Sequence, residues 1–142
     1  MQKWTECDRP LAERLFAFIV IEGVLFCSSF CSIFWLKSRG LMVHGLGFTN
    51  ALISRDEGLH TQFGILLYSK LANKLSQERI EEILAEAVDL ESEFVTDSIP
   101  VELIGMNSRL MTQYIKFVGD YTLKSMGYKP VYEVENPFPF MD

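Results

Sequence analysis

The sequence predicts an all-α protein, a single domain built as a helical bundle. Apolar side chains recur every three or four residues over several long segments, as they do on the buried face of a helix. Capping residues stand at the start of these segments, and glycine or proline follows their ends. The 142 residues contain no strand-rich region. A chain of this length can form a hydrophobic core of its own.

The first helix is expected over residues 9–37 and contains the most apolar stretch of the chain. Residues Leu15–Leu36 read LFAFIVIEGVLFCSSFCSIFWL, in which Glu22 is the only charged side chain. Pro10 is tolerated in the first turn of a helix, and Gly40 suits a left-handed cap at the C-terminal end. The stretch is long enough to span a membrane. We expect instead a central helix buried on all sides, because the amphipathic helices that follow need an apolar surface to pack on.

The second helix is expected over residues 49–73, with Thr49 or Asn50 as its N-cap. The third is expected over residues 77–98, and Ser76 is its predicted cap. Its apolar positions recur at helical spacing, and its acidic residues lie on the opposite face. That acidic face is interpreted as a solvated surface, with no binding role.

The fourth helix is expected over residues 107–126, with Asn107 as N-cap and Gly127 closing its end. The remaining segment, residues 128–142, contains three prolines among aromatic residues. Such a composition disfavours regular structure. We expect an extended tail that lies over the bundle.

Charge and cysteine content exclude several classes of partner. The net charge of −6 argues against nucleic acid and against anionic membrane surfaces, both of which attract basic patches. The 49% apolar fraction indicates a chain that buries much of its surface, in part against a partner. Cys27 and Cys31 are interpreted as small core residues. An odd number of cysteines predicts reduced thiols, and therefore a cytoplasmic protein.

Glu22 and the segment ISRDEGLH together predict a metal site. Burying a lone carboxylate costs on the order of several kcal/mol unless it is neutralised, paired or bound to a metal. Glu57 and His60 are three residues apart and therefore lie on one face of a helix. One Glu on one helix and Glu-x-x-His on another are half of the known ligand set of ferritin-like di-metal proteins. Carboxylates with an imidazole suit iron or manganese.

The residues around Glu22, Glu57 and His60 are weaker indicators of a metal site. The positions that share the stripe of Glu22 on the first helix are Phe26, Ser29, Phe30 and Ile33. The phenylalanines taken alone indicate ordinary core packing. A single Glu-x-x-His occurs often by chance, but Asp56 beside it could accept a hydrogen bond from a metal-bound imidazole on an adjacent helix. His44 lies in a glycine-rich loop and is expected to be solvated.

Four segments resemble the small, radical-generating subunit of class I ribonucleotide reductase. They are EGVLFCSSFCSIFWLKSRGLM, FTNALISRDEGLH, PVELIGMNSRLMTQYI and VENPFPFM, and the likeness extends over nearly the whole sequence. The resemblance implies a ferritin-like helical bundle with an oxygen-bridged di-iron centre that oxidises a nearby tyrosine to a radical. The radical equivalent then serves the large subunit, which reduces ribonucleoside diphosphates to the precursors of DNA.

The resemblance also implies roles for individual residues. The implied iron ligands are Glu22, Glu57 and His60. Asp56 would hydrogen-bond a further histidine ligand that this chain does not contain. The implied apolar wall around the radical consists of Phe26, Phe30 and Ile53.

The chain departs from the family pattern in the number of ligands. The family uses six ligands from four helices, and only three find a match here. No tyrosine matches the radical position, so no catalytic residue is predicted. We expect the C-terminal part of a small subunit, with half of a di-iron centre (manganese accepts the same ligands) and no activity alone. Its expected partners are a small-subunit homodimer or a complementary fragment, and the large reductase subunit.

Two other functions are compatible with these residues. The protein could be a non-catalytic interaction fragment that pairs with a complete small subunit. It could also be another di-metal carboxylate protein, such as an oxygenase or an iron store. The segments PVELIGMN and VENPFPFM favour the reductase, because metal chemistry alone does not require them.

Overall fold

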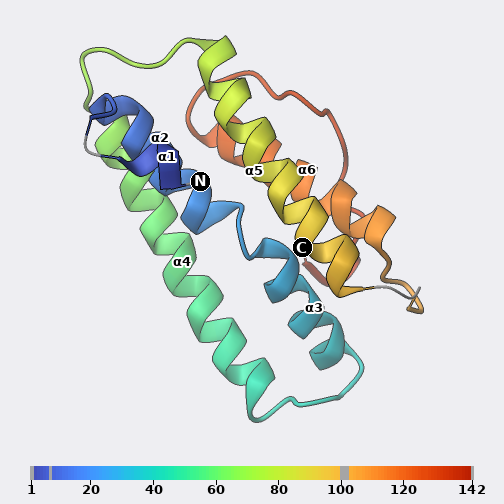
Figure 1. The fold of residues 1–142 in the computed structure, drawn as a ribbon. Helices are drawn as coiled ribbons and strands as arrows, with labels where there is room; N and C mark the ends of the chain where they lie inside the picture. Colours follow the sequence, from blue (N-terminus) through green and yellow to red (C-terminus); the bar gives the residue numbers. More distant parts are fainter. Residues whose placement is uncertain (1, 7, 100–102, 142) are drawn as a thin grey trace.

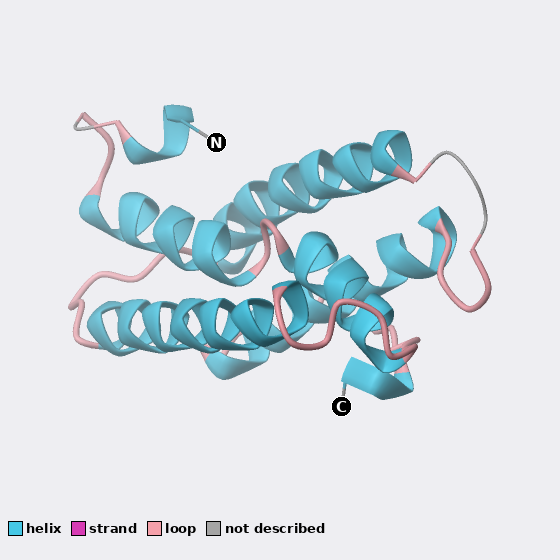
Figure 2. Cartoon of the chain, turned by 90° about the horizontal axis from the view of Figure 1, so that it is seen from below, coloured by secondary structure: helices cyan, strands magenta, loops and turns pink. Residues whose placement is uncertain are grey.

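The fold was analysed in a computed structural model that describes residues 2–6, 8–99 and 103–141. Over these ranges Figure 2 shows helices and loops only, so the all-α prediction is confirmed. The elements are α1 (Gln2–Thr5), α2 (Leu11–Gly23), α3 (Cys27–Ser38), α4 (Leu46–Ser69), α5 (Gln77–Ser98), α6 (Ser108–Ser125) and the 3₁₀ turn η1 (Pro139–Met141).

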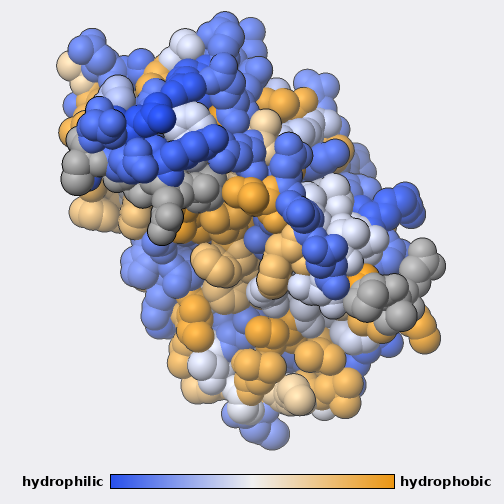
Figure 3. All heavy atoms as spheres, viewed as in Figure 1, coloured by the Kyte–Doolittle hydropathy of each residue, from blue (hydrophilic) through white to orange (hydrophobic). Residues whose placement is uncertain are grey.

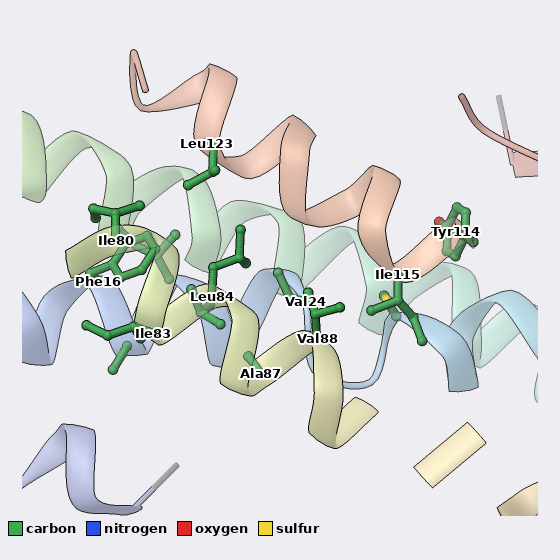
Figure 4. Close-up of a cluster of buried hydrophobic side chains, with 14 of the residues drawn as sticks. Phe16, Val24, Ile80, Ile83, Leu84, Ala87, Val88, Tyr114, Ile115 and Leu123 are labelled. Atoms are coloured by element: carbon green, nitrogen blue, oxygen red, sulfur yellow. The ribbon is translucent and has the colours of Figure 1, made fainter. Parts of the chain in front are cut away.

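The helices form two packed groups around one core. α4 runs alongside α2 and α3, and α5 lies against α6 (Figure 1). Between the groups, apolar side chains of α5 meet those of α2 and α6 (Figure 4). Phe16, Leu84, Ile115 and Leu123 are fully buried there. This burial is the main stabilising term of the bundle.

The expectation of one helix over residues 9–37 was wrong, because the backbone breaks between α2 and α3. The Leu25 N–H donates to the Val20 carbonyl at 3.2 Å, an i→i−5 bond that marks a widened turn. Phe26 then adopts a left-handed conformation, with φ of 71°. That conformation costs a non-glycine residue on the order of 1–3 kcal/mol. A stretch that is apolar on every side carries no periodic signal that could reveal such a break.

The expected burial on all sides was also wrong. Taken as one span, Leu11–Ser38 has the length and hydropathy of a membrane helix, and 44% of its most apolar window is buried. This is weak evidence for a membrane, since a core helix passes the same test. The break divides the span into helices of 13 and 12 residues. Each is shorter than a membrane-spanning helix needs to be.

α4 begins three residues before the expected start and ends four residues before the expected end. Its N-cap is Gly45, and neither Thr49 nor Asn50 caps it. The Thr49 hydroxyl donates to the Gly45 carbonyl at 3.1 Å, and Asn50 Nδ2 donates to the Phe30 carbonyl at 3.2 Å. The amide of Asn50 therefore ties α4 to α3 instead of capping its own helix.

The caps predicted for the last two long helices are present. Ser76 accepts a hydrogen bond from the Arg79 N–H, and Asn107 accepts one from the Leu110 N–H at 2.9 Å. Behind α6 the chain is extended, and it is held by Asp120, which is 2% exposed. The Asp120 carboxylate accepts backbone N–H bonds from Val131, Tyr132 and Glu133 at 2.7, 3.1 and 2.6 Å. The tail is thus fixed to α6.

Candidate metal centre

Glu22 reaches the site from the last turn of α2. Gly23 beside it lies so close to α4 that an added Cβ would stand 3.0 Å from Thr61 Cγ2. One turn further along, an added Cβ on Gly64 would lie 2.7 Å from Ile19 Cγ1. The two helices approach closely because these positions carry no side chain. Sequence reasoning did not anticipate this role of Gly23, although a glycine next to the candidate ligand was the available signal.

Glu57 and His60 reach the same point from α4. His60 Nδ1 lies 2.9 Å from Glu57 Oε2 and 3.1 Å from Glu22 Oε2. One potential ligand atom from each of the three residues lies within 4.8 Å of the others. The structure therefore brings together the three residues that the sequence pairs as ligands, from two different helices.

The site is partly open to solvent, contrary to the expectation of a buried carboxylate. The side chain of Glu22 is 22% exposed, that of Glu57 30% and that of His60 55%. The exposed side of the three groups leaves room for further ligands beside them. Open positions are typical of metal sites that bind a further ligand or an oxidant.

The three groups perturb one another's protonation. Contact with Glu57, followed by burial, raises the pKa of Glu22 above its ordinary value. Contact with Glu22 and then His60 lowers the pKa of Glu57. The two carboxylates, Glu57 before Glu22, raise the pKa of His60. A proton is thus held between the imidazole and the carboxylates, where a cation would satisfy the same charges.

The donor set fits the metals that the sequence resemblance implies. Two carboxylates and one imidazole, without a thiolate, suit iron and manganese. Among the described residues, no second group of three or more His, Cys, Asp or Glu side chains converges in this way. Cys27 and Cys31 are buried in the core and take no part in the site.

The residues predicted to wall off the radical line an open groove instead. Phe26 is 60% exposed, Ile53 is 44% exposed and Phe30 is half-buried. Together with Glu22 and Glu57 they border a groove of about 380 Å³ between α3 and α4. The groove brings the predicted apolar residues next to the ligands, but it is not closed over them.

Asp56, next to Glu57 in the sequence, is not one of the three converging residues. Its carboxylate is 54% exposed and pairs with the guanidinium of Arg55 at 3.3 Å. The described residues offer it no imidazole, so its predicted role toward a further histidine stays a prediction. His44 is exposed in the loop before α4, as expected for a solvated side chain.

The structure contains a second cavity that was not predicted from the sequence. It encloses about 670 Å³ on the α6 side of Glu22 and Glu57, and Leu25, Tyr114 and Tyr121 are among its lining residues. Tyr121 on α6 is 66% exposed. The ligands therefore stand between two hollows.

Comparison with known proteins decides the family. Residues 1–137 match the family model "Ribonucleotide reductase, small chain". The protein belongs to the ribonucleotide reductase small-chain family. It is 55% identical over 140 residues to a ribonucleoside-diphosphate reductase small chain of Arabidopsis thaliana, and 56% identical over 141 residues to the small chain of Trypanosoma brucei brucei. These relatives are oxidoreductase subunits, and the sequence spans 42% of the length of each while 99% of its own length is matched.

A solved small-chain structure shows the same fold. The ribonucleotide reductase Rnr4 homodimer from Saccharomyces cerevisiae superimposes with a TM-score of 0.90 at 39% identity. The match covers 99% of this protein and 45% of the yeast protein. The ferritin-like fold predicted from the sequence is thereby confirmed, as the fold of part of a small subunit.

Proposed function

We propose that this chain supplies half of the di-metal centre of a ribonucleoside-diphosphate reductase small subunit. The observation that carries the proposal is the convergence of Glu22, Glu57 and His60 on one point. When iron is bound, the family's centre supplies the oxidising power for radical formation. Manganese suits the same donors.

In this proposal the protein's own residues bind the metal and control protons around it. The carboxylates of Glu22 and Glu57 balance the charge of the cation, and His60 gives up the proton that it shares with them. The other three ligands of the family's six would come from the portion of a small subunit to which this sequence does not correspond, in the same or in another polypeptide. The protein alone is therefore expected to show neither a tyrosyl radical nor reductase activity with a large subunit.

The proposed partners follow from the family. The large reductase subunit would use the radical to reduce ribonucleoside diphosphates for DNA synthesis in the cytoplasm. A second small subunit is a further proposed partner, because the similar yeast structure is a homodimer.

Manganese titration tests the metal proposal. Free Mn²⁺ gives a strong electron paramagnetic resonance signal that disappears on binding, so affinity can be measured without any activity. The wild-type protein is expected to bind about one Mn²⁺, and His60→Ala or Glu57→Ala to weaken binding about tenfold or more. His44→Ala is the matched control, since His44 is the other histidine of the sequence and lies outside the site. Equal affinities of His60→Ala and His44→Ala would contradict the proposal.

A second candidate function, a non-catalytic interaction fragment, is favoured by the exposed apolar face of α4. This face is formed by Phe48, Leu52, Leu59, Phe63 and Leu66, which are 38–58% exposed. Figure 3 shows apolar residues gathered over α3 and the neighbouring part of α4. Light scattering of the purified protein tests it: a dispersed monomer would argue against pairing through this face.

A further inference from the structure

Glu91 is a buried carboxylate that the candidate metal centre does not use. It lies on α5 and is 5% exposed. Its Oε1 accepts two hydrogen bonds from Ser28, one from the backbone N–H at 3.1 Å and one from the hydroxyl at 2.5 Å. Ser28 is in the first turn of α3, where N–H groups lack partners within the helix and a negative charge is stabilising.

Glu91 replaces a cap that α3 lacks. The residue in the N-cap position of α3 is Phe26, which makes no side-chain capping bond. Helix starts are normally capped by the side chain of a residue adjacent in sequence. Here a carboxylate from a different helix, 63 residues further along the sequence, takes that place. Bonds from a charged acceptor are also stronger than those of a neutral cap.

The first turn of α3, which Glu91 stabilises, adjoins the break between α2 and α3, and this break directly follows Glu22 in the sequence. The i→i−5 bond from Leu25 to Val20 and the left-handed Phe26 belong to this break. If the break relaxed into regular helix, the Phe26 N–H would bond to the carbonyl of Glu22. Adding or removing one residue in a turn rotates the helix on one side of it by about 100° relative to the other. The last turn of α2 would then change its helical geometry, and the side chain of Glu22 would point in a different direction.

We propose that Glu91 is a positioning residue for the candidate metal centre. By capping α3 from α5 it holds the α2–α3 break, and the break keeps Glu22 Oε2 beside His60 Nδ1, 3.1 Å away. This inference rests on the proposed metal-binding function. The predicted effect of Glu91 on the distance between Glu22 and His60, however, can be measured without any metal. It assigns a function to an acid on α5, a helix that carries none of the three candidate ligands.

A series of full-length variants tests the metal side of the proposal. Glu91→Ala removes the acceptor, Glu91→Gln keeps its shape without the charge, and Ser28→Ala removes only the hydroxyl bond. Mn²⁺ affinity should fall about 10- to 100-fold in Glu91→Ala, as is typical when the support of a ligand is lost. The loss should be smaller in Glu91→Gln and smallest in Ser28→Ala. Glu93→Ala is the matched control on the exposed face of α5 and should bind Mn²⁺ like the wild type.

A metal-free measurement separates positioning from general loss of stability. In the wild-type protein, nuclear magnetic resonance should detect a protected Ser28 amide and a nuclear Overhauser contact between the Glu22 side chain and the His60 ring. Glu91→Ala should lose both, and Glu91→Gln should weaken both. Asp120→Asn, which removes the charge that accepts the backbone N–H bonds of residues 131–133, should keep both.

The outcomes are distinct for the two proposals. If the wild type binds no Mn²⁺, the proposed function fails, while loss of the Glu22–His60 contact in Glu91→Ala would still support positioning. If the contact and the Mn²⁺ affinity both persist in Glu91→Gln and Glu91→Ala, the positioning role is overturned.

Discussion

The close approach of α2 to α4 at Gly64 predicts opposite effects of the same substitution at two glycines of one helix. At Gly64 an added Cβ would lie 2.7 Å from Ile19 Cγ1 and 3.1 Å from Phe18 Cδ1. At Gly58 the same Cβ would meet nothing within 4 Å. Gly64→Ala must therefore displace α2, while Gly58→Ala changes only the backbone's freedom.

The magnitudes follow from two opposing terms. Replacing glycine by alanine inside a helix stabilises the protein by about 0.5–1 kcal/mol. Overpacking a tight contact costs about 1–3 kcal/mol. Gly58→Ala should therefore raise the free energy of unfolding, and Gly64→Ala should be less stable than Gly58→Ala by about 1–3 kcal/mol.

Urea unfolding, followed by circular dichroism, measures both variants against the wild type. The comparison uses one residue type and one helix, so the propensity term cancels between the two variants. If Gly64→Ala were as stable as Gly58→Ala, the close packing of α2 on α4 would be refuted. The same displacement would move Glu22 from His60, so Gly64→Ala should also weaken Mn²⁺ binding.

Three further predictions follow from groups at and around the core. Asp120→Asn should destabilise the protein by about 1–3 kcal/mol, because three backbone N–H groups lose a charged acceptor; exposed Asp97→Asn should change the free energy of unfolding little in the same urea assay. The carboxylates of Glu57 and Glu22 raise the pKa of His60, so protonation of the imidazole competes with metal binding up to a higher pH than for an ordinary histidine. Mn²⁺ affinity should therefore fall as the pH drops through the raised pKa of His60. A pH-independent affinity would argue against His60 as a ligand. Burial raises the pKa of Cys31 to about 12 and that of Cys27 well above its ordinary value. In a Cys7→Ser variant, both thiols should therefore react with a disulfide reagent only on unfolding, and rapid reaction of the native protein would contradict their burial.

The three candidate ligands could be selected from the sequence because their signals are local. A charged residue within an apolar stretch and an i, i+3 spacing on a helix do not depend on the details of packing. That the three residues meet depends on glycines at the contact of α2 with α4, which the sequence shows but does not explain. The sequence therefore indicated which residues form the candidate site, but not why they lie close together.

The break between α2 and α3 could not be predicted in this way. Helical periodicity locates a helix by its polar face, and residues 15–36 have almost none. The break depends on Glu91, whose partner Ser28 lies 63 residues away. A signal for Glu91 did exist, since it shares the spacing of the buried Leu84, Val88 and Val95 on α5. An acid on an apolar stripe indicates a specific partner, but not which one.

The openness of the groove could not be predicted from the sequence. Phe26 and Ile53 are apolar and stand next to the ligands, as the family resemblance implied. Their exposure cannot be derived from spacing, because it depends on how α3 and α4 pack in three dimensions.

The most direct test of the central claim is a crystal of this protein soaked in Mn²⁺ and measured for anomalous scattering. We predict a peak within bonding distance of carboxylate oxygens of Glu22 and Glu57 and of a ring nitrogen of His60. A structure in which manganese binds elsewhere, with these three side chains apart, would contradict the claim.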